Sequence, residues 1–293
     1  MKGLFKEASS FTQLIAVACI TCITLLLSGF FLYFLQQNMA MDTAFSIRLM
    51  MATQSVFVFL IPAILSQYLL FGKSLQEGFQ LKKAALLYFI LGLGIMICIP
   101  PIVTVIEVWY QSIPTPAFLK GIAEWIKLNE EKSNSLLQLL FATQTWQNLA
   151  GNLLVICLLT GIVEEFFFRG ILQKIIIRLT GNTHLGILVT AVTFSLLHLQ
   201  STGFISRILI GALLGYMFIW SRTLWLPILA HACNNAIAVI SETYYPTTDN
   251  MVEPIDTSIV IGSLFLVALF TLGLWLLFRG KLEFLTTKHK TIT

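Results

Sequence analysis

The sequence predicts an all-α, polytopic integral membrane protein with about eight transmembrane helices. Of its 293 residues, 57% are hydrophobic and only 11% are charged, which excludes an ordinary soluble globular protein. Most of its charge-free apolar stretches approach the roughly 20 residues that a helix needs to cross a bilayer. These stretches occupy residues 14–35, 49–71, 84–106, 146–163, 184–206, 208–221, 223–241 and 257–278.

The first stretch follows Lys2 and Lys6, as the apolar part of a signal peptide would. It is longer than the roughly 7–15 residues of a signal core, and no convincing small-residue cleavage site follows it. We therefore expect a retained first helix. The stretch 208–221 is short, and its helix could begin before Arg207 if that side chain extends to the membrane interface.

The placement of Lys and Arg predicts the orientation. With the N-terminus inside the cell, most of the 18 Lys and Arg residues lie on the cytoplasmic side, as the positive-inside rule requires. The exceptions are Arg48, Lys120, Lys127, Lys132 and Arg207. Both termini are therefore predicted to be cytoplasmic, and this bias accounts for the net charge of +4 without a nucleic-acid partner.

Residues 1–145 are expected to form three transmembrane helices and an outer loop, with kinks or ends at Pro62 and at Pro100-Pro101. Within the loop, 109–145, apolar residues recur at helical spacing, which predicts a short helix in the membrane interface. They are Phe118, Leu119, Ile122 and Ile126. Either an interfacial anchor or a lid would fit this pattern.

Residues 146–241 differ from the rest and are predicted to be the catalytic core. Their apolar segments are shorter and richer in glycine, which permits close helix packing around a polar interior. Residues 242–293 are predicted to form an outer acidic loop, a last transmembrane helix and a basic tail.

The first polar motif of the core places Glu164 and Glu165 inside apolar sequence. Charge at membrane depth costs about 2.5–3.5 kcal/mol per residue on insertion scales, so such residues are functional candidates. On a helix, Arg169 lies on the same face as Glu165, while Glu164 is rotated by about 100°. Arg169 could then neutralise Glu165 and leave Glu164 facing a wet cavity as a general base. A salt bridge near the membrane surface, with no catalytic role, is the alternative.

Two further motifs each contain one histidine. In Phe194-Ser-Leu-Leu-His198 the aromatic ring could pack beside the imidazole, although a lone histidine in an apolar helix is more often a hydrogen-bonded interior residue. In His231-Ala-Cys-Asn-Asn235 an imidazole and a carboxamide share one helix face. Such donors suit a developing oxyanion.

Together these residues supply a base, two imidazoles and an amide. Hydrolysis needs a base, a positioned water and oxyanion donors, and these side chains can provide them. The sequence contains no Gly-x-Ser-x-Gly nucleophile motif, no His-Glu-x-x-His zinc motif and no phosphate-binding glycine loop. A serine hydrolase is therefore not expected.

The three motifs, in this order, resemble the CAAX protease and bacteriocin-processing (CPBP or Abi) family of intramembrane proteases. Its pattern is Glu-Glu-x-x-x-Arg, then Phe-x-x-x-His, then His-x-x-x-Asn, and the resemblance covers about residues 150–240. It implies an eight-span helical fold in which Glu164 and His198 activate water. His231 and Asn235 would stabilise the oxyanion, while Glu165, Arg169 and Phe194 support the site.

The sequence does not decide whether the site requires a metal ion. Glu164, His198 and His231 could hold a catalytic zinc with one position left for water, although two imidazoles in a cavity do not require one. The expected partners are a peptide or protein substrate at the membrane and the lipid itself, in a bacterial cytoplasmic membrane. Two other functions remain: a non-catalytic immunity or scaffold protein of the same fold, and a proton- or ion-coupled transporter.

Overall fold

The computed structural model describes residues 2–39, 43–245 and 256–290, the last segment with side chains as far as Gly280. Every regular element in these residues is helical, as predicted. The α-helices are α1 (Ser10–Asn38), α2 (Ala44–Ser55), α3 (Ile61–Ser66), α4 (Leu75–Gly78), α5 (Leu86–Cys98), α6 (Pro100–Gln111), α7 (Lys120–Phe141), α8 (Trp146–Asn152), α9 (Thr160–Phe167), α10 (Gln173–Thr180), α11 (Thr183–Leu196), α12 (Phe204–Ser221), α13 (Trp225–Tyr244) and α14 (Thr257–Lys290). Val56–Leu60, Gln67–Phe71, Leu153–Leu159 and Phe168–Leu172 are π-helical, and Ala117–Leu119 is a 3-10 turn.

Five continuous helical stretches of the described chain are long and apolar enough to cross a membrane. They are Ser10–Asn38, Ala44–Phe71, Trp146–Thr180, Phe204–Ser221 and Thr257–Gly280. The pair α5 and α6 makes a sixth if the two helices count as one span, bent by 42°. The predicted number of eight is therefore not confirmed, because α11 is too short and α13 does not meet the same test.

The prediction of one span over residues 184–206 is wrong for its second half. Helix α11 ends at Leu196, and a loop of residues 197–203 precedes α12. Leu199 and Gly203 take left-handed backbone conformations, with φ of 50° and 75°. A helix cannot continue through such residues, and the loop's polar groups bind side chains of other segments instead. Helix α12 does begin before Arg207, at Phe204, as predicted.

The two proline sites behave differently. Pro100-Pro101 begins α6 and coincides with the 42° bend, as expected for prolines that remove backbone donors. Pro62 neither ends nor breaks the stretch Ala44–Phe71. The π-helical turn Val56–Leu60 comes just before it, so the backbone shifts its hydrogen-bond pattern at the proline rather than ending the helix.

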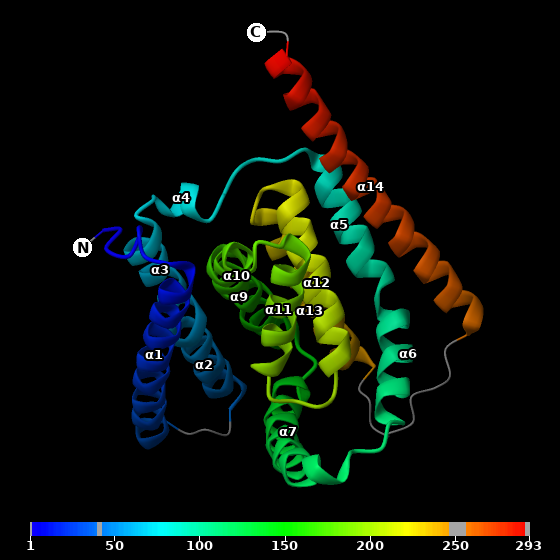
Figure 1. The fold of residues 1–293 in the computed structure, drawn as a ribbon. Coiled ribbons are helices and arrows are strands. Elements are labelled where there is room, and N and C mark those ends of the chain that lie inside the picture. The colour runs from blue at the N-terminus through cyan, green and yellow to red at the C-terminus, as the bar shows by residue number, and fades with distance from the viewer. Residues whose placement is uncertain (1, 40–42, 246–255, 291–293) are drawn as a thin grey trace.

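The helical stretch that contains the glutamate motif lies at the centre of the bundle (Figure 1). Helices α1 to α3 flank it on one side, while α5, α6 and α14 lie on the other. Helix α11 packs against α10 and α12, and α13 packs against both α9 and α5. Asn182 caps the start of α11 and Gly181, with φ of 65°, ends α10, so the chain reverses in a tight turn.

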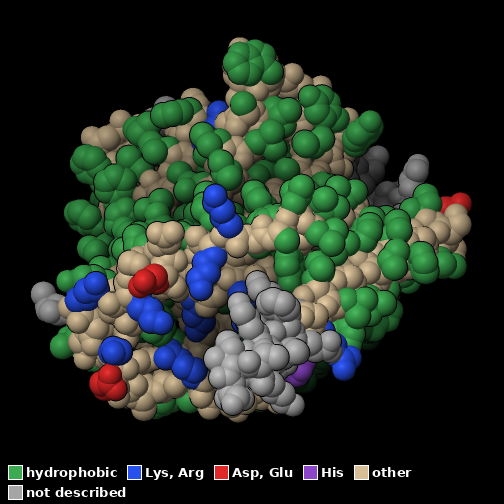
Figure 2. Space-filling view, turned by 90° about the horizontal axis from the view of Figure 1, so that it is seen from above, with side chains coloured by type: hydrophobic (Ala, Val, Ile, Leu, Met, Phe, Trp, Pro, Cys, Tyr) green, Lys and Arg blue, Asp and Glu red, His purple; other side chains and the backbone are tan. Residues whose placement is uncertain are grey.

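The outer surface of the bundle is apolar, whereas several charged side chains are buried. Phe30 and Leu26 are each 75% exposed and Phe265 is 67% exposed, while Glu165 and Arg169 are fully buried. An exposed apolar surface of this extent marks contact with lipid rather than water. Lys and Arg side chains gather on one end face (Figure 2). The chain is thus an integral membrane protein.

Both described ends of the chain lie toward the same end of the bundle as α4 (Figure 1). Helix α7, at the other end, has 22 residues and lies within the segment 109–145, where a short helix was predicted. Residues 246–255 of the predicted acidic loop and the side chains of the predicted basic tail from residue 281 onward lie outside the described residues.

Candidate active site

Glu165 and Arg169 form a buried ion pair at the centre of the bundle. Arg169 Nη1 donates to Glu165 Oε1 over 2.7 Å, as the spacing of four residues predicted, and neither side chain is exposed. Arg169 Nη2 also donates to the carbonyl oxygen of Gly211 in α12, over 2.9 Å. Buried charges are tolerated when they are paired and hydrogen-bonded in this way.

The π-helical turn Phe168–Leu172 contains Arg169 and was not foreseen from the sequence. Such a turn inserts an extra residue into the helical repeat, and π-helical turns occur frequently at functional sites. No residue pattern in this segment distinguishes it from an ordinary α-helix.

His231 of α13 joins this ion pair. Its Nδ1 lies 2.9 Å from Glu165 Oε1, and its Nε2 lies 3.8 Å from Glu164 Oε2. Because a carboxylate accepts hydrogen bonds, Nδ1 carries a proton and donates to Glu165, while Nε2 points toward Glu164. The imidazole is 4% exposed, and Glu165 thus orients it toward the second carboxylate.

Close packing of α9 on α13 makes this contact possible. An added Cβ on Gly161 would lie 3.2 Å from the backbone nitrogen of Ala232, the residue after His231. A larger side chain at Gly161 would therefore push apart the helices that hold Glu164 and His231. This agrees with the close approach predicted from the glycine content of the core.

Glu164 is the acid with the fewest partners in the cluster. It is 5% exposed, and its Oε2 has no hydrogen-bond partner among the described residues. Glu165 Oε2 is also unpartnered, but Glu165 Oε1 already contacts both Arg169 and His231. A buried acceptor without a donor is costly, so Glu164 is the position where a water or substrate group would be held most favourably.

His198 lies in the loop after α11 rather than on a helix, which corrects the predicted helical motif. Its ring still packs against Phe194, with ring centroids 4.8 Å apart, and its Nδ1 donates to the Phe194 carbonyl over 2.8 Å. The Phe194 ring is also 5.8 Å from that of His231. Phe194 therefore holds both imidazoles, and His198 keeps Nε2 as an acceptor.

Asn235 lies one turn after His231 on α13, and its Nδ2 donates to the Ile156 carbonyl over 3.1 Å. This bond fixes the carboxamide and uses one of its two N–H groups. Asn234 donates to Asn235 Oδ1 over 3.4 Å.

Among the described residues, no three His, Cys, Asp or Glu side chains are placed as metal ligands, the set Glu164, His198 and His231 included. His231 instead turns its Nδ1 to Glu165, and the Arg169 guanidinium pairs with Glu165. The donor set therefore does not fit a zinc site, and the chemistry below is derived from the protein groups alone.

Two carboxylates outside the motif region hold the loop that contains His198, and the sequence analysis missed both. Glu130 of α7 accepts hydrogen bonds from Ser201 N and Oγ and from Thr202 N. Glu107 of α6 accepts one from Gly203 N. These partners are 71 to 96 residues apart in sequence, so no local pattern could have revealed them.

Residues 146–237 match the model of one protein family, described as type II CAAX prenyl endopeptidase, Rce1-like. No curated protein and no solved structure matches the chain. The matched segment contains Glu164, His198, His231 and Asn235. Of these, Glu164 and His231 lie together in the cluster, His198 reaches His231 through the Phe194 ring, and Asn235 contacts Ile156 instead. The resemblance predicted from the three motifs is thus confirmed, and the central part of this chain is similar to the Rce1-like CAAX prenyl endopeptidases.

Proposed function

We propose that this protein is an intramembrane endopeptidase that hydrolyses a peptide bond close to the membrane. The observation that carries the proposal is the division of labour between the two glutamates. Glu165 is bound by Arg169 and His231, whereas Glu164 Oε2 lacks a hydrogen-bond donor in the described chain. An unsatisfied carboxylate beside an imidazole is suited to bind and deprotonate water.

The reaction begins with a water molecule that donates hydrogen bonds to Glu164 and to Nε2 of His198. Glu164 accepts the proton as the water oxygen attacks the peptide carbonyl. His231 takes part as an imidazolium, which donates to Glu165 through Nδ1 and to the oxyanion on the carbonyl oxygen through Nε2. The remaining N–H of Asn235 donates a second hydrogen bond to the oxyanion. The C–N bond then breaks, and Glu164 returns its proton to the leaving amine.

The wider setting of this reaction is also part of the proposal. Both termini lie in the cytoplasm of a bacterial cell, residues 146–241 form the catalytic core, and residues 1–145 and 242–293 surround it in the cytoplasmic membrane. The substrate is a peptide or protein that reaches the site from the membrane. Helix α7, with exposed Ile122, Trp125 and Leu128, anchors the outer loop at the membrane interface.

The proposal is tested by comparing new protein N-termini in membranes of cells that express the protein or a variant. We expect termini that depend on the wild type to disappear with Glu164→Ala, His198→Ala or His231→Ala, while each variant stays inserted and folded. Glu131→Ala, which removes an exposed carboxylate of α7, is the matched control and should retain them.

The same cells separate the other two functions. A Glu164→Gln variant that fully replaces the wild type in vivo would indicate a scaffold or immunity protein. Glu164-dependent ion flux into liposomes, without new N-termini, would indicate a transporter. Either result would refute the protease.

A further inference from the structure

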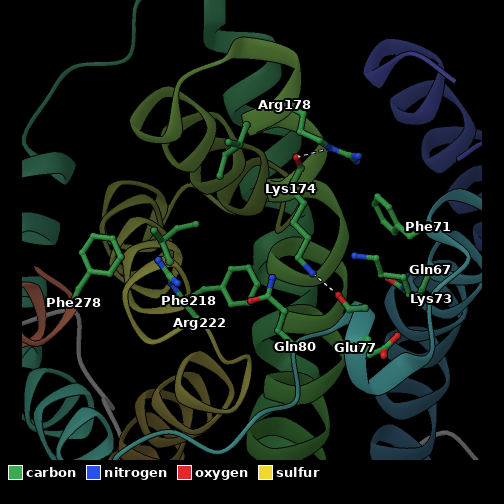
Figure 3. Close-up of a pocket in the computed structure, with 13 residues that line it drawn as sticks. Gln67, Phe71, Lys73, Glu77, Gln80, Lys174, Arg178, Phe218, Arg222 and Phe278 are labelled. Carbon is green, nitrogen blue, oxygen red and sulfur yellow. Dashed lines mark hydrogen bonds between the residues drawn. The ribbon is translucent and has the colours of Figure 1, made fainter. Parts of the chain in front are cut away.

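A cavity of about 550 Å³ opens at the end of the bundle where α4, α10, α12 and α14 meet (Figure 3). It is separate from the glutamate cluster, whose residues do not line it. Four cationic side chains line the cavity, together with one carboxylate, that of Glu77. The cations are Lys73, Lys174, Arg178 and Arg222.

None of these four cations forms an ion pair within the described residues. Lys174 Nζ donates to the carbonyl oxygen of Gly78, and Arg178 Nη2 donates to the amide oxygen of Gln13 over 2.9 Å. Lys73 and Arg222 are exposed at the rim. Lys73 and Arg178 are close enough to Lys174 for their charges to repel it. The cavity therefore holds an excess of positive charge, with four cations against the single carboxylate of Glu77.

The wall of the cavity also contains an unpartnered amide. Gln67 is fully buried, and neither its Nε2 nor its Oε1 has a hydrogen-bond partner among the described residues. It packs against Gly78, where a Cβ would overlap Gln67 Nε2. A buried amide without partners lowers stability unless something else binds it. Its N–H groups can supply hydrogen bonds to an anion held by the lysines and arginines.

Three aromatic rings keep the cationic groups at the cavity wall. The rings of Phe71, Phe218 and Phe278 lie 5.0 Å from the Arg178 guanidinium, 5.3 Å from Lys174 Nζ and 5.9 Å from the Arg222 guanidinium, respectively. Cation–π contacts restrict these side chains without neutralising them. They also make the wall apolar beside the charges, as an amphiphilic ligand requires.

We propose that this cavity binds a phosphate group, such as the headgroup phosphate of an anionic phospholipid. Arginine and lysine at the wall match phosphate oxygens, and basic pockets between transmembrane helices commonly bind acidic headgroups. The cavity lies on the face where Lys and Arg gather (Figure 2), which faces the cytoplasm if the orientation proposed above holds. The site does not depend on the protease activity.

The test measures binding of phosphatidylglycerol to the purified full-length protein by native mass spectrometry, with phosphatidylcholine as the neutral comparison. The cavity variant is Lys73→Gln with Arg222→Gln, both exposed positions. The matched control is Lys82→Gln with Lys83→Gln, which removes the same charge near the cavity but outside its wall. We expect affinity for phosphatidylglycerol to fall roughly tenfold in the cavity variant and little in the control.

A second variant tests the buried amide. Gln67→Leu keeps much of the side-chain volume but removes the polar atoms, so it should raise the melting temperature of the lipid-free protein and weaken phosphatidylglycerol binding. A purely structural role of Gln67 would leave the affinity unchanged, and that result would contradict its part in the site.

Competition with inorganic phosphate distinguishes a site for free phosphate from a site for a phospholipid headgroup. Displacement of the lipid by millimolar phosphate would indicate a site for the phosphate group itself, whereas lipid binding without displacement would assign the site to a phospholipid. An equal loss of phosphatidylglycerol binding in the cavity variant and in the control variant would show that only the total charge of this face matters, and it would refute the site. Absence of binding of either ligand would refute it as well.

Discussion

The central polar cluster and the cationic cavity both place charge inside an apolar bundle, but they balance it differently. In the cluster, Arg169 and His231 surround Glu165 with hydrogen bonds of 2.7 and 2.9 Å. In the cavity, four cations share a wall with a single carboxylate and form no ion pair in the described chain. The cluster is closed to solvent, while Arg222 and Lys73 at the cavity are exposed.

This difference indicates which groups hold the structure together and which remain available. A buried charge must be paired within the protein, because its desolvation is otherwise uncompensated. An exposed charge can be solvated by water until a ligand replaces the water. In the cluster the available group is the carboxylate of Glu164, and in the cavity it is the set of cations.

The largest difference between the two regions is expected in stability. Arg169→Met leaves the fully buried Glu165 without its cation and should destabilise the protein by about 3–5 kcal/mol. Arg222→Gln, at the exposed rim of the cavity, should change the free energy of unfolding by no more than about 0.5 kcal/mol. Equilibrium unfolding in detergent measures both.

The double variant Arg169→Met with Glu165→Gln is the control for this prediction. It removes both charges and should recover much of the stability that Arg169→Met loses. If Arg169→Met were as stable as the wild type, the buried ion pair would not be the element that holds the cluster together.

A smaller effect is expected for Asn235, whose amide donates to the Ile156 carbonyl. Asn235→Ala should reduce kcat for a peptide identified in the membrane comparison by about 10²–10³-fold, as for the loss of one oxyanion donor. Asn234→Ala, one position earlier, is the comparison: it removes only the longer 3.4 Å hydrogen bond to Asn235 Oδ1 and should reduce kcat far less. Equal losses in both variants would assign Asn235 to helix packing rather than to the reaction.

Substitution of Glu130 tests whether the reaction depends on the contact between α7 and the loop that contains His198. Glu130→Ala removes three hydrogen bonds to the loop that contains His198, so kcat should fall about tenfold with little change in KM. Glu131→Ala removes the adjacent exposed carboxylate and should leave kcat unchanged. A rise in KM alone would indicate that α7 contacts the substrate instead.

The smallest effect is expected from metal removal. Arg169 pairs with Glu165, and no three metal ligands come together among the described residues, so exhaustive chelation should leave kcat unchanged in protein of verified metal content. Loss of activity that returns with zinc alone would reassign Glu164, His198 and His231 as ligands and replace the mechanism proposed here.

Much of the site could be predicted from local spacing. The interval of four residues placed Arg169 beside Glu165, and the same interval placed Phe194 beside His198, because neighbours on a helix are set by its period. The second contact persists although His198 lies beyond the helix end. The motifs also placed the family resemblance at about residues 150–240, and the Rce1-like match covers residues 146–237.

The number of spans could not be predicted in this way. Apolar runs near 84–106, 184–206 and 223–241 correspond to a bent helix pair, a 14-residue helix with a loop, and a helix that does not meet the criteria for a span. Apolar composition shows only that a segment can lie in lipid. It does not show whether the segment crosses the membrane as one helix or packs inside the bundle as a shorter or bent helix.

The sequence by itself determined that the protein is helical, that it resides in a membrane, and which polar residues are candidates for catalysis, since these follow from composition and from the helical period. Only the tertiary structure decided that His231 binds Glu165 and faces Glu164, that Glu130 holds the His198 loop, and that four cations meet at one cavity. Those contacts join segments far apart in the chain. Their geometry depends on how the helices pack, and no local pattern encodes it.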